Sequence, residues 1–475
     1  MAFLTGGANT LLATGFSVAN SVRFDGSSAS MKITPGSNMN LDLWTWSGWI
    51  KRGSLGVLQS IFSCDNATSD FTELAFDAND KLNFLNLVSN NIKGKKITTR
   101  VFRDPSAWSH IVLAWNSSNG TAGDRIKIYV NGVRETVFDT SDNPDSGVDS
   151  SFGESGVATL IGTFVGEASR FFNGYMAEVV LIDGAALAPT SFGEFNEDSG
   201  IWKPIDVSGL TFGTHGFYLD FEASDNLGND ANGGTDLTET NLAAVDQATD
   251  TCTNNFATLN PLVPSQGGFT PGSATYTEGA TLFTTVNASS SYSRANSTIL
   301  LTTGKWYVEI KYVNAGSIFG LVGITGSNAT AVAAYPGVYA YDYAWYGNGG
   351  FSSGDGNFYN NNGIVRELGS GFDNNDILGM AIDLDNNTIQ YYRAGSAVGS
   401  ANAIAAPSAT DFGGYVVCAG EWSNSSNAVF NFNFGNPPYA NSSDAADGNG
   451  FGAFEYAPPS GFLAICTKNL STVNS

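Results

Sequence analysis

Two segments of this chain read as β-hairpins, and they constrain its fold more than any other feature. Residues 108–115 and 125–130 form the first, which turns at Asn131-Gly132, and residues 377–384 and 388–393 form the second, which turns at 385–387. Both alternate apolar and polar residues, and both turns hold residues that tolerate a positive φ angle, as hairpin turns require. Because the hairpins lie far apart in dissimilar sequence, we predict two separate β-sandwiches in series.

Composition supports an all-β structure. The 475 residues include 56 glycines and 12% aromatic residues, and helix-forming stretches are scarce. This is typical of sheets joined by many turns. The formal net charge of −23 argues against a nucleic-acid partner, because like charges repel.

The sequence carries no strong signal for disulfide bonding, zinc binding, secretion or membrane insertion. The cysteines, which are Cys64, Cys252, Cys418 and Cys466, lie far apart, without zinc spacing or a dense disulfide framework. We expect at least three of them to be buried thiols. The first residues lack the basic and apolar regions of a secretory signal, and no stretch approaches the ~20 apolar residues of a membrane span.

The chain divides by composition into five parts. We predict an N-terminal arm at 1–17, a first sandwich at 18–200, an acidic linker with one strand at 201–250, a second sandwich at 251–437 and a loose C-terminal tail at 438–475. In the second sandwich, Phe430, Phe432 and Phe434 share one face of a strand, which predicts that this face is buried. The arm and the tail have no apolar pattern of their own, and such segments commonly order on a partner.

Two families resemble the two sandwiches. The motifs at 44–49, 108–113, 128–132 and 172–178 resemble the laminin-G-like, concanavalin A-like jelly rolls. The motifs at 304–310, 319–324, 376–385, 389–393 and 433–435 resemble SPRY domains. The animal laminin-G disulfide is missing, so receptor binding by those domains does not transfer. The combination resembles structural proteins of marine tailed bacteriophages, which implies a place on the virion surface after synthesis in the host cytoplasm.

Catalytic patterns are missing from the sequence. Glucanases of the concanavalin A-like fold carry Glu-x-Asp-x-Glu on one strand, which puts two carboxylates on one face. The acidic group at 194–198 has the wrong spacing, and the histidines, His110 and His215, are far apart. His110 lies in a predicted strand, where a structural role is the better interpretation. We therefore expect a protein that is not an enzyme.

Two acidic loops are candidate calcium sites, since Ca²⁺ prefers carboxylate and carbonyl oxygens. The candidate ligands are Asp142, Asp145 and Asp149 in one loop and Asp225 and Asp230 in the other. Neither loop fits the Asp-x-Asp-x-Asp-Gly pattern, and a solvated turn is the alternative interpretation. We expect no other cofactor.

The richest aromatic run is the candidate ligand surface. Exposed aromatic rings can stack on sugars while amides and carboxylates bond hydroxyls. The candidate residues are Tyr339, Tyr341, Tyr343, Trp345, Tyr346, Asn348 and Asp355. The resemblance to SPRY-like domains implies that this region contributes to a binding surface formed by variable loops. The alternative is that alternate residues of the run pack in the sandwich core.

The leading hypothesis is a non-catalytic virion surface protein, a tail-fibre or spike component that adheres to glycans of the host surface. It would contact other virion proteins through the arm or the tail and form a homo-oligomer, for which a trimer would suit a fibre. The first alternative is a capsid or head decoration, or head fibre, that stabilises the shell. The second is a glycan-processing enzyme with diverged catalytic residues.

Overall fold

The chain forms two β-sandwiches, as its alternating strands predict. The computed structural model describes residues 4–5, 15–67, 69–165, 169–262, 266–267, 274–285, 288–314, 319–328, 335–347, 356–424 and 427–473. It divides into a first sandwich, Ala13–Thr253, and a second sandwich, Asn254–Ser475 together with Met1–Leu12.

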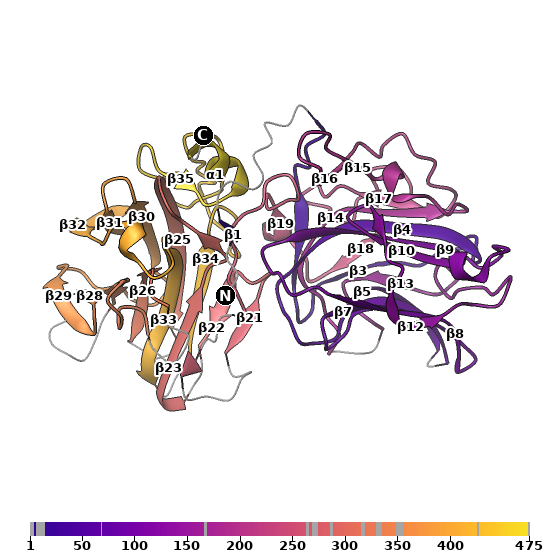
Figure 1. Ribbon diagram of the computed structural model, residues 1–475, viewed down its shortest axis with the longest axis horizontal. Helices are drawn as coiled ribbons and strands as arrows, with labels where there is room; N and C mark the ends of the chain where they lie inside the picture. The colour runs from indigo at the N-terminus through magenta and orange to yellow at the C-terminus, as the bar shows by residue number, and fades with distance from the viewer. Residues whose placement is uncertain are drawn as a thin grey trace. The chain divides into compact units, whose positions relative to one another are not determined.

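The first sandwich consists of two antiparallel sheets, seen as two layers in Figure 1. One, the front sheet, has the order β11 (Val133–Arg134), β10 (Ile126–Val130), β9 (Trp108–Asn116), β4 (Leu43–Arg52), β14 (Asn173–Asp183), β2 (Ser21–Asp25) and β19 (Gln247–Ala248), with β17 (Phe217–Leu219) also paired to β14. The other, the back sheet, has the order β12 (Phe138–Asp142), β8 (Asn91–Val101), β7 (Lys81–Val88), β6 (Asp70–Phe76), β5 (Gln59–Ala67), β13 (Thr159–Ile161), β3 (Ser30–Ile33) and β18 (Thr238–Thr240).

Aromatic side chains fill the space between these sheets. Trp44, Trp46 and Trp115 are fully buried in one core cluster, so the alternate tryptophans Trp44 and Trp46 of β4 face inward. The predicted hairpin turn also forms. Asn131 has a φ of 48° and Gly132 a φ of 77°, and this turn joins β10 to β11.

A further layer covers the outward face of the front sheet. It includes β15 (Gly193–Phe195), β16 (Trp202–Pro204) and the short helix η2 (Pro189–Ser191). Phe192 and Phe212 from this layer pack with Val180 and Val112 of the sheet. The front sheet is therefore buried on both faces.

Residues 201–250 belong to the first sandwich, which corrects their prediction as a linker between domains. They supply β16, β17, β18 and β19, of which the last three pair with β14, β3 and β2. The predicted strand near 216–221 is β17. The composition suggested a loop because these strands are short and the sequence between them is rich in turn residues.

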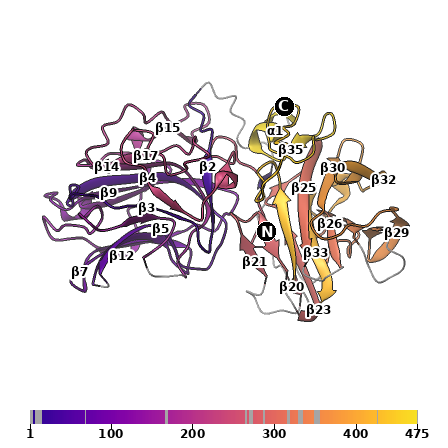
Figure 2. The same ribbon diagram turned by 180° about the vertical axis from the view of Figure 1, so that it is seen from behind.

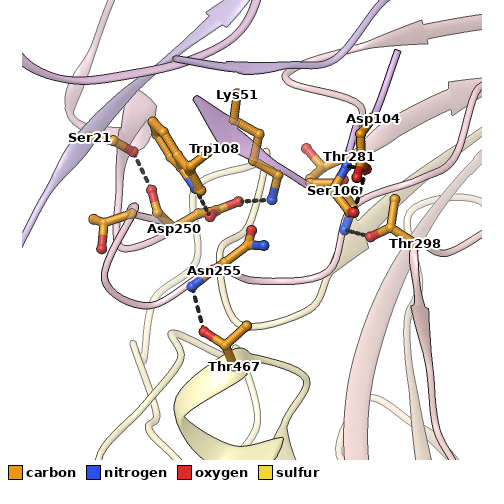
Figure 3. A network of polar contacts seen from close by, with 12 residues as sticks. Ser21, Lys51, Asp104, Ser106, Trp108, Asp250, Asn255, Thr281, Thr298 and Thr467 are labelled. Atoms are coloured by element: carbon orange, nitrogen blue, oxygen red, sulfur yellow. Dashed lines mark hydrogen bonds and ion pairs between the residues drawn. The ribbon is translucent and has the colours of Figure 1, made fainter. Parts of the chain in front are cut away.

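Asp250 ties the end of this segment to the front sheet, as Figure 3 shows. Its Oδ2 atom lies 2.7 Å from Lys51 Nζ, and both side chains are only 1% exposed. Trp108 Nε1 donates to Asp250 Oδ1 at 3.1 Å, and Ser21 Oγ donates to the backbone oxygen of Asp250. Removal of either Lys51 or Asp250 would leave the other charge buried without its partner, and this would strongly destabilise the fold.

The second sandwich also has two sheets (Figure 2). The outer sheet has the order β20 (Gln266–Gly267), β23 (Ala288–Asn296), β33 (Val416–Asn424), β26 (Gly320–Thr325), β27 (Asp342–Tyr346), β28 (Asn357–Asn360) and β29 (Gly363–Glu367). The inner sheet has the order β21 (Thr275–Thr277), β22 (Leu282–Thr284), β34 (Ala428–Asn433), β25 (Lys305–Asn314), β30 (Ile377–Asp383), β31 (Thr388–Arg393) and β32 (Ser396–Ala403), with β35 (Leu463–Ala464) paired to β25. As predicted, Phe430, Phe432 and Phe434 all lie in the core.

The C-terminal segment packs on the second sandwich itself, whereas its sequence suggested a loose tail. Phe454 is fully buried, and its ring meets that of Tyr307 edge-on at 5.2 Å. The Glu309 carboxylate of β25 accepts hydrogen bonds from the backbone N–H groups of Glu455 and Tyr456. β35 and the helix α1 (Thr467–Val473) end the chain beside β25 (Figure 2).

Part of the predicted arm pairs with the second sandwich. β1 (Leu4–Thr5) runs parallel to β24 (Ile299–Leu300). The remaining 3-10 helices are η1 (Ala122–Asp124), η3 (Ala244–Asp246) and η4 (Pro407–Ala409). Within the described residues, no helix has the length and apolar character needed to cross a membrane. All four cysteines are free thiols, and Cys64, Cys418 and Cys466 are buried.

Candidate functional site

The aromatic run of β27 divides between the two faces of the outer sheet. Tyr343 and Trp345 point into the core, where Trp345 is fully buried and donates from Nε1 to the backbone oxygen of Ser370 at 3.1 Å. The Tyr343 ring stacks on Phe358. These two residues therefore correct the predicted ligand set, because a side chain packed in the core cannot meet a ligand.

On the opposite face, four tyrosines gather into what we call the tyrosine patch: Tyr292 of β23, Tyr335, Tyr346 of β27 and Tyr359 of β28. The ring of Tyr335 lies 5.4 Å from that of Tyr292 and 6.1 Å from that of Tyr359. The ring of Tyr346 lies 6.4 Å from that of Tyr359. β-Strand alternation puts Tyr346 on this face because Trp345 faces inward. β23 and β28, which are labelled in Figure 1, belong with β27 to the outer sheet.

The patch has a buried floor and a half-buried rim. Tyr335 is 9% exposed and Tyr346 is 4% exposed, whereas Tyr292 and Tyr359 are half-buried. Tyr346 is thus also removed from the predicted ligand surface, because its side chain is buried. Within the patch, the side chains that remain available to a ligand are those of Tyr292 and Tyr359, which the sequence prediction did not include because strand pairing brings them to the patch.

A hydrogen bond holds Tyr335, in the floor of the patch, beside an exposed amide side chain. The Tyr335 hydroxyl donates to Asn362 Oδ1 at 2.9 Å, and Asn361 and Asn362 are both exposed in the turn between β28 and β29. The Tyr346 hydroxyl is buried without a hydrogen-bond partner among the described residues. Burial raises the pKa of the Tyr335 and Tyr346 hydroxyls, so both remain protonated.

Tyr339 and Tyr341 lie half-buried in the segment before β27. The backbone N–H of Tyr339 donates to Asp342 Oδ2 at 3.3 Å, and Asp342 forms a buried ion pair of 2.9 Å with Arg294. These contacts fix the segment to the sheet and leave Tyr339 and Tyr341 as candidate ligand residues. Asn348 and Asp355 lie outside the described residues.

The loop at Asp230 shows the hydrogen bonding of an ordinary turn. Asp142, Asp145, Asp149 and Asp225 are exposed, whereas Asp230 is buried. The Asp230 carboxylate accepts hydrogen bonds from the backbone N–H groups of Tyr218, Asn232 and Gly234. Within the described chain, no three histidine, cysteine or acidic side chains gather where they could hold a metal. Calcium binding by the loops stays a prediction.

His110 has the structural role expected of it. The ring is 1% exposed, Trp202 Nε1 donates to its Nδ1 at 3.0 Å, and Ser47 Oγ lies 2.9 Å from its Nε2. Because Nδ1 accepts a hydrogen bond, the ring is the neutral tautomer that donates from Nε2. Burial lowers the pKa of His110 to about 3.

Glu178 is the most chemically unusual residue that the sequence did not indicate. It lies in β14 where the pairing with β4 shifts between Ala177 and Val180, and its φ is 51°. The Tyr218 hydroxyl donates to Glu178 Oε2 at 2.7 Å. Burial, together with the charges of Asp220, Asp206 and Glu222, raises the pKa of Glu178 to about 7. The sequence carries no signal for this bulge.

Comparison with known proteins supports the fold of the first sandwich. Residues 25–190 match the family model of the concanavalin A-like lectin/glucanases superfamily. No curated protein matches the chain.

Three solved structures illustrate the similarity. A heptameric SAP-like pentraxin from Limulus polyphemus has 17% sequence identity and a TM-score of 0.29, with 36% of this chain and 80% of that chain covered. A human SPRY domain has 18% identity and a TM-score of 0.26, with 32% and 91% covered. A candidate carbohydrate-binding protein from Bacteroides ovatus has 19% identity and a TM-score of 0.31, with 48% and 59% covered. Residues 25–190 are thus similar to the concanavalin A-like, laminin-G-like family, and the chain is also similar to a solved SPRY domain.

Proposed function

We propose that this chain is a non-catalytic glycan-binding protein. The observation that carries the proposal is the tyrosine patch, in which Tyr292 and Tyr359 are half-buried and the Tyr335 hydroxyl donates to the exposed amide of Asn362. Aromatic faces stack on the C–H faces of sugars, while amides bond their hydroxyls. The lectin-like family of the first sandwich is consistent with this class of ligand.

Its biological setting, we further propose, is the surface of a tailed-bacteriophage virion, where the chain adheres to glycans of the host cell as part of a fibre or spike. The support is the resemblance of its two modules, in this order, to such proteins. The C-terminal segment is less suited to anchoring than its sequence suggested, because Phe454 and Cys466 are buried in its own sandwich. Contact with other virion proteins through the arm or the tail is part of this proposal.

A glycan array with the full chain tests the binding proposal. Replacement of Tyr359 by alanine should weaken binding by about fivefold, since one stacked ring contributes roughly 1 kcal/mol. Tyr359→Phe keeps the ring and should retain binding. Tyr456→Ala, a half-buried tyrosine outside the patch, is the matched control.

Two results would contradict the proposal. Equal binding by Tyr359→Ala and the wild type would remove the patch from the contact surface. Release of reducing sugar from any bound glycan would make the chain an enzyme. Low-resolution imaging of particles labelled on this chain tests the virion setting separately.

A further inference from the structure

Lys51 and Asp250 form an ion pair on the outward face of the front sheet of the first sandwich. Lys51 points outward because its neighbour Ile50 packs in the core between the two sheets. Lys51 Nζ lies 2.7 Å from Asp250 Oδ2, and both side chains are only 1% exposed. By contrast, the side chains of the Lys305–Asp383 pair, at 3.0 Å, are 35% and 11% exposed. Lys51 and Asp250 therefore meet in a place that is shielded from bulk water.

Strand pairing and hydrogen bonds hold the two groups against each other (Figure 3). Lys51 pairs in register with Trp108 of β9 on one side and with Tyr175 of β14 on the other. Its Nζ atom lies 5.7 Å from the centroid of the Tyr175 ring. Ser21 Oγ donates to the backbone oxygen of Asp250 at 2.6 Å, which fixes the segment that follows β19. An amine and a carboxyl group held in this way can react as if each were present at very high concentration.

The two oxygens of the Asp250 carboxyl group have partners with different chemistry. Lys51 Nζ donates to Oδ2, whereas Trp108 Nε1 donates to Oδ1 at 3.1 Å. The carboxyl carbon is bonded to Oδ2, so the lysine nitrogen already lies next to the carbon that it would attack. One partner can therefore supply protons to a leaving oxygen, and the other can stabilise negative charge that develops on Oδ1.

The ion pair is also the costly form of these two groups. Removal of two charges from water carries a desolvation penalty that their mutual attraction offsets only in part. Burial lowers the pKa of the Lys51 amine, which favours the neutral, nucleophilic form. An amide in the same place would carry no charge at all.

We propose that Lys51 and Asp250 condense, after the first sandwich has folded, to an isopeptide bond between Lys51 Nζ and Asp250 Cγ. One proton first passes from the ammonium group to Oδ2, which gives an amine and a carboxylic acid. The amine attacks the carboxyl carbon, and the negative charge develops on Oδ1, to which Trp108 Nε1 donates. A second proton moves from the nitrogen to Oδ2, the bond between Cγ and Oδ2 breaks, and one water molecule leaves as the amide forms.

The bond joins the middle of the front sheet to the end of the first sandwich, 199 residues along the chain. β19 is two residues long and lies at one edge of this sheet, so tension applied at residue 253 would first separate β19 from β2. With the bond, the tension passes from Asp250 into β4, which lies between β9 and β14. The cross-link therefore strengthens the first sandwich whether or not the tyrosine patch binds a glycan.

The intact mass of the purified, denatured full chain tests this bond. The wild type should be lighter than its sequence mass by one water molecule, and peptide mapping should recover a branched peptide that joins Lys51 to Asp250. Lys51→Arg keeps the positive charge beside Asp250 but has no primary amine, so it should keep its full sequence mass. Lys305→Arg, at the more exposed pair with Asp383, is the matched control and should lose one water molecule as the wild type does.

Trp108→Phe distinguishes a role in the reaction from a role in packing. This variant keeps an aromatic ring but removes the donor to Asp250 Oδ1, so the bond should form more slowly by on the order of a hundredfold. The linked fraction is followed by mass over time in freshly purified chains, and circular dichroism checks that the variant is folded. Equal rates in Trp108→Phe and the wild type would refute the role of Trp108.

Two outcomes would overturn the bond itself. One is a wild-type chain that retains its full sequence mass after prolonged incubation. The other is a loss of water that persists in Lys51→Arg or that maps elsewhere, for example to a cyclised aspartate at Asp447-Gly448. Because the wild-type mass and peptide map require no substitution, the test stands even if a variant fails to fold.

Discussion

Glu178 illustrates how one residue acquires its chemistry from its surroundings. A non-glycine residue at a φ of 51° in a central strand is strained, and such strain persists only where neighbouring structure enforces it. Here the shift in pairing between β14 and β4 re-aims the side chain toward Tyr218. A carboxyl group that would ionise near pH 4 in water is thereby buried among other acids.

Replacement of Glu178 by glutamine should flatten the pH dependence of stability. The pKa of this carboxyl is raised from 4.5 to about 7 in the folded chain, so the folded state holds the proton to a higher pH than the unfolded state. Its contribution to the free energy of unfolding is therefore full below pH 4.5, declines as the pH rises and is lost above about pH 7. At about pH 8 we expect Glu178→Gln to be more stable than the wild type by on the order of 1–3 kcal/mol.

Urea unfolding across this pH range measures the effect. Glu197→Gln, which alters an exposed carboxylate, is the control and should follow the wild type. A residual slope is expected in every variant, because burial also raises the pKa of Glu309 to about 6 and that of Glu421 to about 7. Parallel wild-type and Glu178→Gln profiles would contradict the assignment.

At the scale of elements, a strand supplies two surfaces and its neighbours decide how each is used. β27 gives Tyr343 and Trp345 to the core and Tyr346 to the tyrosine patch. The C-terminal segment shows the same dependence, since its scattered aromatic residues acquire a core only on the outward face of β25 and β30. There Phe454 packs with Tyr307 and Ala381.

Phe454→Ala should destabilise the second sandwich by about 3–5 kcal/mol, because it removes a fully buried ring and leaves a cavity beside Tyr307. Thermal unfolding followed by circular dichroism would show the lowered midpoint. Val365→Ala, at a side chain that is 57% exposed, should have little effect. A midpoint that stays at the wild-type value in Phe454→Ala would mean that the C-terminal segment is not part of the folded core.

At the scale of the whole molecule, the chain contains two separate cores. The clusters around Trp44 and around Val180 lie within Ala13–Thr253, and the cluster around Trp306 lies within Asn254–Ser475. Residues 201–250 complete the first of these units through β17, β18 and β19. The boundary between units therefore falls near Thr253, close to the predicted start of the second sandwich at residue 251, whereas the segment before it belongs to the first unit.

The fragment 13–253 should fold by itself, since its cores, its sheets and the Lys51–Asp250 ion pair are contained in it. We expect a β-type circular dichroism spectrum and one cooperative thermal transition. The shorter fragment 13–200 lacks Asp250 and leaves Lys51 buried without its charge partner, so it should be far less stable. Equal stability of the two fragments would show that residues 201–250 are dispensable.

The sequence alone determined the local pattern of this protein. The alternation of Phe430, Phe432 and Phe434 and the turn residues Asn131 and Gly132 specify strands and hairpins, because side-chain direction and backbone freedom are properties of neighbouring residues. Both sandwiches followed from such patterns, and so did the aromatic run that forms part of the tyrosine patch.

Only the tertiary structure decided what lies on each surface. Alternation shows that β27 has two faces but not which one is covered, and Tyr292 and Tyr359 join Tyr335 only through pairing of distant strands. The bulge at Glu178 arises in the same way, from the register between β14 and β4, which are far apart in the chain. Register between remote strands depends on the packing of the whole sandwich, and no local pattern encodes it.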